Sequence, residues 1–129
     1  MQQAERAVKL PDATHPITLA MTGVHVLVKS GGRIVADTRR AVTFTESKYP
    51  PVQYIPRDDV DMTLLEPTQH KSYCPYKGEA TYFSIKGIGE RGINAVWSYV
   101  GAYSAVAQID GCLAFYSDRV DSIEILEDW

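Results

Sequence analysis

The stretch VHVLVKSGGRIVAD, residues 24–37, predicts a β-hairpin and decides the fold class. Valine recurs at every second position over residues 24–28, which places these side chains on one face of an extended strand. The Ser30-Gly31-Gly32 cluster follows, and glycine tolerates the positive φ angles that tight hairpin turns require. Residues 33–37 are therefore expected to form the returning strand.

Further segments of strand length, separated by proline and glycine, continue toward the end of the chain. They comprise residues 41–45, 54–55, 80–86, 93–99 and 112–116, with a short strand near Tyr73. A short helical turn is expected from Asp58 or Asp59 to Pro67. Short strands in this number, with one or two short helices, predict a mainly β, single compact antiparallel domain. It would be built as a folded-over sheet or a partly closed barrel.

The length of 129 residues favours one domain, because half that length seldom supports a stable core without disulfides or a metal. Residues 1–23 have no sustained period and are expected to form an N-terminal arm. Residues 24–121 form the predicted β domain, and residues 122–129 are expected to be an acidic, solvated C-terminal end. With 13 basic and 16 acidic residues, the chain is not expected to bind nucleic acid.

The cysteine content and the N-terminal sequence predict a cytoplasmic protein with free thiols. Cys74 and Cys112 are the two cysteines, and residues 1–20 contain charges and prolines in place of the apolar core of a secretory signal. Residues 92–109 are uncharged but too polar for a membrane span, so no membrane partner is expected.

Metal ligands and nucleophiles are sparse in the sequence. No CxxC or HExxH pattern occurs, and no metal site is expected. His70 and Cys74 are the only nearby pair of a base and a nucleophile, which makes Cys74 a catalytic candidate. The alternative is a turn cysteine and an exposed histidine, because residues four apart in an extended segment lie roughly 13 Å apart. The sequence identifies no cofactor.

The segment GIGERG, residues 87–92, has the GxGxxG spacing of a phosphate-binding loop. Such a loop should lead into a helix, whereas a strand-like segment follows here. We therefore expect a flexible hairpin connection at this position.

Charged and aromatic residues near the predicted strand ends form the candidate ligand site. They are Arg40, Glu46, Tyr54, Tyr76, Lys77, Tyr82 and Trp97. In a shared pocket, aromatic walls would hold a planar or sugar-like ligand while Arg40 and Lys77 meet an anionic group. Glu46 and Lys77 are then catalytic candidates, with Glu46 as a proton acceptor. In the structural alternative, Glu46 pairs with Arg40, Lys77 occupies a turn and the aromatic rings fill the core.

An ordered series of motifs resembles the small DUF427 proteins. The series comprises VADTRRA (35–41), Glu46 followed by PP (50–51) and YIP (54–56), DV (59–60), SYCPYKG (72–78) with Ala80 and Tyr82, AVWSY (95–99) and AFYSDRVD (114–121). The resemblance covers about residues 24–121 and implies a mainly β bacterial domain without an established activity. The family's motif positions fall here on Asp37, Arg40, Glu46, Tyr54, Cys74, Lys77, Tyr82 and Trp97. After Tyr99, where the family often has proline, this chain has VGAY (100–103).

Three functions follow as hypotheses. The leading one is binding of a small anionic or nucleotide-like molecule in the pocket of arginine, glutamate, lysine and aromatic residues. The alternative is a non-catalytic module for protein interaction or self-association, with a homo-oligomer as the assembly. The third is a nucleotidyltransferase-like enzyme, a label sometimes given to the resembling family. It would require carboxylates that hold Mg²⁺, and a turn explains the cluster of Asp58, Asp59 and Asp61 equally well.

Overall fold

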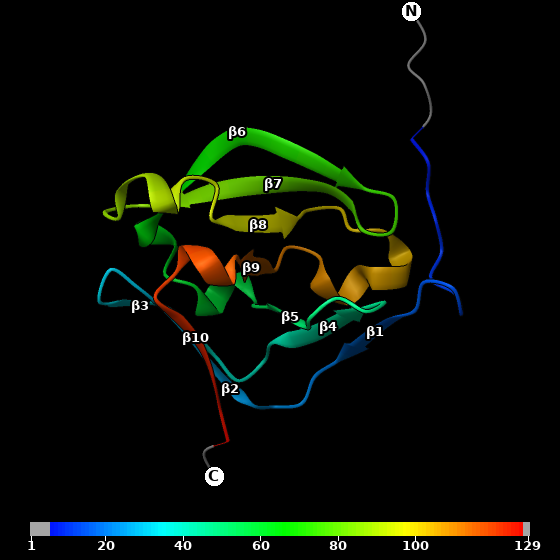
Figure 1. Cartoon of the computed structure of the whole chain (residues 1–129), viewed down its shortest axis with the longest axis horizontal. Coiled ribbons are helices and arrows are strands. Elements are labelled where there is room, and N and C mark those ends of the chain that lie inside the picture. Colours follow the sequence, from blue (N-terminus) through cyan, green and yellow to red (C-terminus); the bar gives the residue numbers. More distant parts are fainter. Residues whose placement is uncertain (1–5, 128–129) are drawn as a thin grey trace, which may run out of the picture.

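The computed structural model describes residues 6–127, which fold into three antiparallel sheets (Figure 1). Their strand orders are β1-β4-β5, β10-β2-β3 and β6-β7-β8-β9. The strands are β1 (Ile17–Ala20), β2 (His25–Ser30), β3 (Arg33–Thr38), β4 (Val42–Glu46), β5 (Val52–Tyr54), β6 (Leu65–Cys74), β7 (Gly78–Ile85), β8 (Val96–Tyr99), β9 (Leu113–Phe115) and β10 (Ser122–Leu126). The 3₁₀ turns are η1 (Arg57–Asp59), η2 (Met62–Leu64), η3 (Gly89–Gly92), η4 (Ser104–Ile109) and η5 (Ser117–Arg119). The prediction of a mainly β single domain with short helical segments is confirmed.

The hairpin of β2 and β3 forms where the alternating valines and the glycine pair predicted it. Ser30 pairs with Arg33 across the turn, and Gly31 and Gly32 adopt φ angles of 60° and 74°. Val26 and Val28 are fully buried on the inner face of the sheet. The period-two pattern therefore fixes which face of this hairpin contacts the core.

A hydrogen-bonded corner connects two of the sheets. Ile55 follows β5, and its backbone exchanges two hydrogen bonds of 2.8 Å with Leu113 of β9. Both side chains are buried, at 1% and 0% exposure. The chain thus folds over on itself at this corner. Within residues 6–127, the strands remain three sheets and do not close into a single ring.

Residues 57–74 differ locally from the expected helical turn and short strand. Two 3₁₀ turns, η1 and η2, replace the helix, and the Asp61 side chain caps η2 by accepting a hydrogen bond from the Thr63 amide. The chain then extends at Leu65 and forms the long strand β6, which passes through Pro67. The pairing of β6 with β7 shifts register between Pro67 and Lys71. This irregularity accommodates a proline, which has no amide hydrogen for a sheet ladder.

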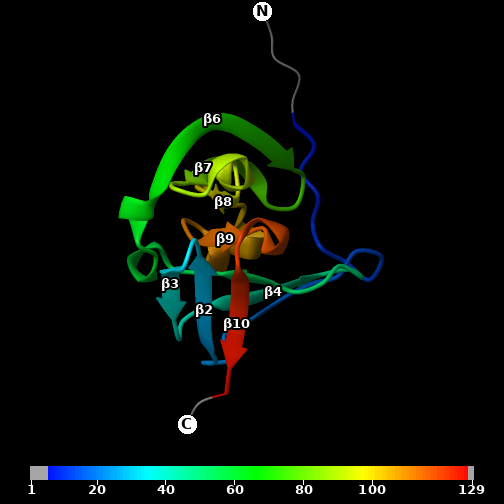
Figure 2. The same ribbon diagram turned by 60° about the vertical axis from the view of Figure 1, so that its left-hand side comes forward.

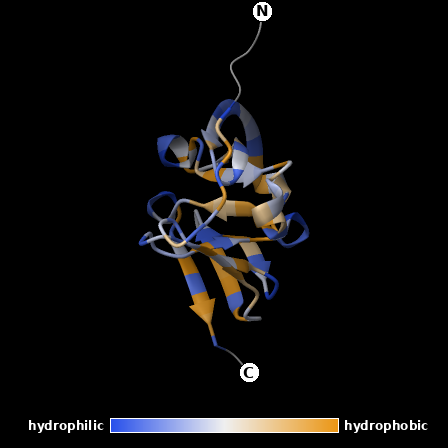
Figure 3. Ribbon diagram, turned by 90° about the vertical axis from the view of Figure 1, so that its right-hand side faces the viewer, coloured by the Kyte–Doolittle hydropathy of each residue, from blue (hydrophilic) through white to orange (hydrophobic). Residues whose placement is uncertain are grey.

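The C-terminal segment forms β10, which pairs along β2 (Figure 2). Hydrophobic and hydrophilic residues alternate along it (Figure 3), so Ile123 and Ile125 share one face while Glu124 pairs with Lys29 at 3.0 Å on the other. Glu124 is thus part of an ordered strand, whereas Glu127 follows the strand and is exposed. Residues 128–129 lie outside the described part of the chain.

The N-terminal segment follows the tip of the β6–β7 hairpin and then enters a sheet (Figure 1). The Lys9 amide donates to the Pro75 carbonyl at 2.9 Å, and Arg6 pairs with Glu79 at 3.0 Å. β1 pairs with β4, so part of the predicted arm belongs to the β domain. Residues 1–5 of that arm lie outside the described residues. Nowhere in residues 6–127 does a helix have the length and apolar character needed to cross a membrane.

Candidate functional site

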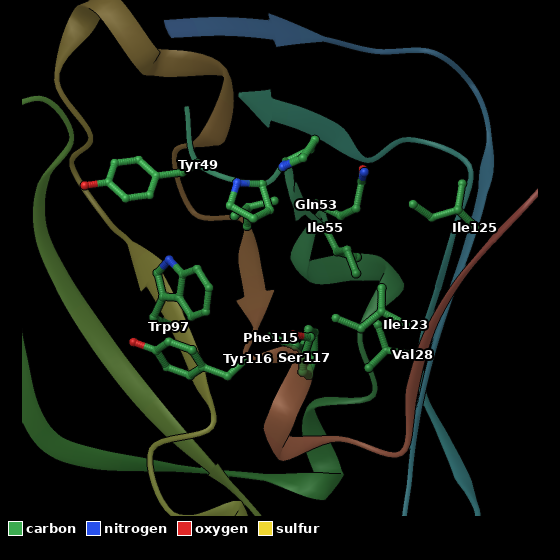
Figure 4. Close-up of a pocket in the computed structure, with 13 residues that line it drawn as sticks. Val28, Tyr49, Gln53, Ile55, Trp97, Phe115, Tyr116, Ser117, Ile123 and Ile125 are labelled. Carbon is green, nitrogen blue, oxygen red and sulfur yellow. The ribbon is translucent and has the colours of Figure 1, made fainter. Parts of the chain in front are cut away.

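One concavity of the protein is an apolar cleft with a volume of about 520 Å³, drawn in Figure 4. Its walls come from all three sheets and from the loop between β4 and β5. The lining residues are Val28, Tyr49, Pro50, Pro51, Val52, Gln53, Ile55, Trp97, Phe115, Tyr116, Ser117, Ile123 and Ile125. A cavity of this size, lined mainly by apolar and aromatic side chains, has the dimensions of a small-molecule site.

Two aromatic residues form one wall of the apolar cleft. The rings of Trp97 and Tyr116 lie 4.5 Å apart between centroids, with an angle of 44° between their planes. The Trp97 indole nitrogen donates a hydrogen bond to the Tyr54 hydroxyl at 3.2 Å, and Tyr54 packs edge-on against Phe44. Burial is the main cause that raises the pKa of Tyr54, so this hydroxyl stays neutral. The indole of Trp97 is therefore anchored to the core while its ring lines the cleft.

Aliphatic residues form the opposite wall. Figure 4 shows Val28, Ile123 and Ile125 across the cleft from Trp97 and Tyr116. Val28 and Ile123 are paired residues of β2 and β10, and Ile125 is 53% exposed at the end of this row. The wall exists because β10 extends the inner face of the β2–β3 hairpin.

A half-buried cluster of charged residues lies next to the same β4–β5 loop. Glu46 ends β4, and its two carboxylate oxygens contact Lys77 Nζ at 3.1 Å and His15 Nε2 at 2.8 Å. The side chains of Lys77, Glu46 and His15 are only 14%, 16% and 24% exposed. Burial alone would raise the pKa of Glu46, but the hydrogen bond to His15 and the charge of Lys77 together hold it below its usual value.

Aromatic rings enclose this charged cluster. The Lys77 ammonium lies 5.1 Å from the ring centroid of Phe44 and 5.4 Å from that of Tyr99, distances at which cation–π attraction operates. Tyr76 stacks on His15 with centroids 4.1 Å apart and planes 9° apart. Lys77 is thus neutralised by Glu46 and covered by rings, an arrangement that leaves its ammonium poorly placed to receive an external anion.

Arg40 lies elsewhere, so the pairing of Arg40 with Glu46 that the structural alternative contained is wrong. Its guanidinium contacts Asp59 of η1 at 3.1 Å, and the side chain is 57% exposed. An isolated bridge between Ala36 and Val60 holds η1 beside β3, and Thr38 donates to the same Asp59 carboxylate at 2.6 Å. The hydrogen bonds from Thr38 and from Arg40 lower the pKa of Asp59. Arg40 belongs neither to the charged cluster nor to the apolar cleft.

Tyr82 and Cys74 occupy two further positions. The Tyr82 hydroxyl forms a 2.8 Å hydrogen bond with Ser72, and the His70 ring packs edge-on against Tyr82 with centroids 4.5 Å apart. Cys74 is a half-buried free thiol packed on a core cluster, and no hydrogen bond joins it to His70 within residues 6–127. The structure thus pairs His70 with Tyr82 rather than with Cys74.

The seven candidate ligand residues are therefore distributed over four places. Lys77 pairs with Glu46, and Tyr76 joins them by stacking on His15. Trp97 lines the apolar cleft and is joined to Tyr54. Tyr82 lines a second cavity together with Tyr116, and Arg40 pairs with Asp59. Nothing in the geometry assigns a catalytic role to Glu46, Lys77 or Cys74. Their catalytic roles stay predictions.

Sequence reasoning did not select several residues that build these sites. His15 belongs to no motif of the sequence, and Pro50-Pro51 stand in a motif of the resembling family but carry no reactive group. Tyr116 stands in a motif of the resembling family, which was the one available signal for it. Ile123 and Ile125 alternate with polar residues, a period-two pattern that predicts a strand with one apolar face.

Comparison with known proteins gives one family. A family model described as a domain of unknown function (DUF427) matches residues 18–125. No curated protein matches the sequence. In residues 6–127, no group of three or more histidine, cysteine, aspartate or glutamate side chains is placed to hold a metal ion.

Proposed function

This chain belongs to the DUF427 family, and we propose that it binds a small, planar, mainly apolar molecule in the apolar cleft. The observation that carries the proposal is the cleft itself, about 520 Å³ in volume, with the ring of Trp97 anchored in its wall. Concave apolar sites with a few polar groups are the common form of ligand pockets. Gln53 and Ser117 supply those polar groups here.

In the apolar cleft, recognition would depend on contacts with rings rather than with Arg40 and Lys77. The earlier expectation of an anionic or nucleotide-like ligand relied on Arg40 and Lys77 facing one pocket. Arg40 pairs with Asp59, and Lys77 pairs with Glu46. The remaining recognition surface is aromatic and aliphatic, so apolar contact supplies most of the binding free energy.

The size of that free energy sets the affinity to expect. Burial of about 200 Å² of apolar ligand surface, at about 25 cal/mol per Å², gives about 5 kcal/mol. Association also costs translational and rotational freedom, so a compound with two fused aromatic rings should bind with a Kd no tighter than about 0.1 mM. Binding of such a probe should therefore be measured at millimolar protein and probe concentrations, which suit NMR.

The test uses Trp97 as its own reporter. The chain contains two tryptophans, so Trp129→Phe leaves one indole N–H signal in the ¹H–¹⁵N spectrum. Titration with 2-naphthol should shift this signal and saturate. Ile125→Arg, which adds a charge at the edge of the apolar cleft, should weaken binding about tenfold or more.

Ile34→Arg is the matched control. Ile34 of β3 is 52% exposed, nearly equal to Ile125, and it does not line the apolar cleft. This variant should keep the affinity of the parent protein. If the indole signal never moves, or if both arginine variants lose binding equally, the cleft is not the binding site.

Self-association is the second candidate, and the position of β10 favours it. Within residues 6–127, β10 is the outermost strand of its sheet, next to β2. An unpaired strand edge can accept another strand, including one from a second copy of the chain. Sedimentation velocity tests this role: a concentration-dependent dimer that Ile125→Pro abolishes supports it, and a monomer at all concentrations contradicts it.

A further inference from the structure

A second, more polar cavity also has Tyr116 in its lining. Its volume is about 490 Å³, and its lining residues are His70, Tyr82, Glu90, Ile93, Asn94, Tyr116 and Arg119. We refer to it as the polar cavity. None of its residues other than Tyr116 lines the apolar cleft.

Tyr116 is the wall that the two sites share. Its ring packs against Trp97 in the apolar cleft, and Figure 4 shows these two rings side by side. Burial raises the pKa of Tyr116 to about 12, with a smaller contribution from a hydrogen bond with Tyr82. The hydroxyl is therefore a neutral hydrogen-bonding group. Tyr82 in turn lines the polar cavity. One molecule that lies across Tyr116 would therefore contact apolar surface at one end and polar groups at the other.

The strongest donor in the polar cavity is Arg119. Its Nη1 atom makes only long hydrogen bonds, 3.5 Å to the Arg91 carbonyl and 3.3 Å to the Ile93 carbonyl. Within residues 6–127, no carboxylate lies within ion-pair distance of this guanidinium. A guanidinium prefers planar, bidentate contact with a carboxylate, and the two carbonyls do not provide it.

The other groups in the polar cavity are compatible with an anion. The Asn94 side-chain oxygen already accepts a 2.7 Å hydrogen bond from Thr68, which leaves the amide nitrogen as a donor. His70 contributes a ring and Tyr82 a hydroxyl. Glu90 is the opposing charge, but it is exposed on η3, where water and salt screen it more than they screen the half-buried Arg119.

We propose that the ligand of this protein is amphipathic: a planar ring occupies the apolar cleft, and a carboxylate attached to that ring reaches the polar cavity, where Arg119 and Asn94 hold it. The inference rests on the proposed function, because the ring must bind first in the cleft. It adds the chemical class of the ligand, an aromatic carboxylate. It also names Arg119 as the residue that distinguishes this acid from a neutral analogue.

The experiment compares two probes that differ only in charge, 2-naphthylacetate and 2-naphthylacetamide. Both are titrated into the Trp129→Phe protein at pH 7 and followed by the Trp97 indole signal. We expect the acid to bind about tenfold more tightly than the amide, as for one added charge-assisted contact. The acid, and not the amide, should also shift the side-chain Nε–H signal of Arg119.

Two variants remove one charge each from the same cavity. Arg119→Gln should abolish the preference for the acid over the amide, and an unchanged melting temperature would confirm that the variant is folded. Glu90→Gln removes the opposing charge and should increase the affinity for the acid by about two- to threefold. Because Glu90 is exposed, we expect this substitution to leave the fold unchanged.

The outcomes separate this inference from the proposed function. Equal affinity for acid and amide in the parent protein would overturn the carboxylate assignment and leave the cleft proposal intact. A preference for the acid that persists in Arg119→Gln would place the anion elsewhere and also overturn it. If neither probe moves the Trp97 signal, the proposed function fails and this inference fails with it.

Discussion

Glu46 and Lys77, 31 residues apart in the sequence, form an ion pair of 3.1 Å in which both side chains are largely shielded from water. The pair joins the end of β4 to the turn between β6 and β7. His15 adds the N-terminal segment to the same carboxylate at 2.8 Å. Three separate parts of the chain are therefore held by one side chain, so the cluster should contribute to the stability of the fold.

Protonation of Glu46 should destabilise the fold in acid. Its pKa is lowered in the folded protein from an ordinary value of 4.5, so its stabilising contribution is present above about pH 4.5 and disappears as the pH falls through the folded-state pKa. Urea unfolding at several pH values measures this. The difference in unfolding free energy between the parent protein and Glu46→Gln should be largest near pH 7 and shrink at pH 3.

Glu79→Gln serves as the control for that experiment. Glu79 pairs with Arg6 and Lys71, but its side chain is 38% exposed. Pairs of this kind contribute about 0–1 kcal/mol, so the pH-dependent difference should be smaller than for Glu46. A larger pH dependence for Glu79→Gln would contradict the role assigned to Glu46.

The losses of stability caused by removal of Lys77 and of Glu46 should not be additive. Lys77→Met leaves the shielded Glu46 carboxylate with His15 as its remaining partner, and we expect a loss of about 1.5–3 kcal/mol. In the double variant Lys77→Met/Glu46→Gln, no unpaired charge remains, and the total loss should be smaller than the sum of the single losses. Additive losses in urea unfolding would show that the two side chains do not interact in solution.

The hydrogen bond between Trp97 and Tyr54 should contribute to stability as well as to the shape of the apolar cleft. Trp97→Phe removes the donor and leaves the buried Tyr54 hydroxyl without it, at an expected cost of about 1–3 kcal/mol. The same substitution in a Tyr54→Phe background should cost less, because no hydroxyl is then left unpaired. Equal costs in the two backgrounds, measured by urea unfolding, would argue against this hydrogen bond.

Gly92 should not tolerate a side chain. A Cβ atom at this position would lie 2.3 Å from the Ile85 carbonyl oxygen and 2.8 Å from Ile88 Cγ1. Because a backbone atom cannot move as a side chain does, we expect Gly92→Ala to lose about 3 kcal/mol or more. Gly32→Ala is the control, since a Cβ there meets no atom within 4 Å and only the φ of 74° opposes it, at about 1–2 kcal/mol. A thermal melt in which Gly92→Ala is the more stable of the two would contradict the close packing.

The sequence predicts the local elements well where side-chain period and turn chemistry agree. The β2–β3 hairpin is such a case, because alternating valines and Gly31-Gly32 both specify it. β10 has the same alternation, but five acidic residues in the last twelve led us to expect a solvated end. The strand that β10 pairs with, β2, is about 100 residues away in the sequence. Local sequence does not reveal that the edge of β2 is available to pair with another strand.

The site was harder to predict because its members meet only through tertiary structure. Arg40 and Glu46 are an even number of residues apart, which suggested a pair on one strand face, but β4 begins only at Val42. The Ala36–Val60 bridge instead brings Asp59 next to Arg40, and the β6–β7 turn brings Lys77 to Glu46. The resemblance to DUF427 proteins did select Trp97, and it included Tyr116 within a motif, so it located one wall of the apolar cleft.

The most direct test of the account is the position of a bound ring. Intermolecular nuclear Overhauser effects should be recorded between 2-naphthol and the Trp129→Phe protein, in which Trp97 supplies the only indole. We predict contacts to the Trp97 ring and to the methyl groups of Ile123 and Ile125, which lie on opposite walls of the cleft. Contacts confined to other surfaces, or none with the ligand near saturation, would contradict the account.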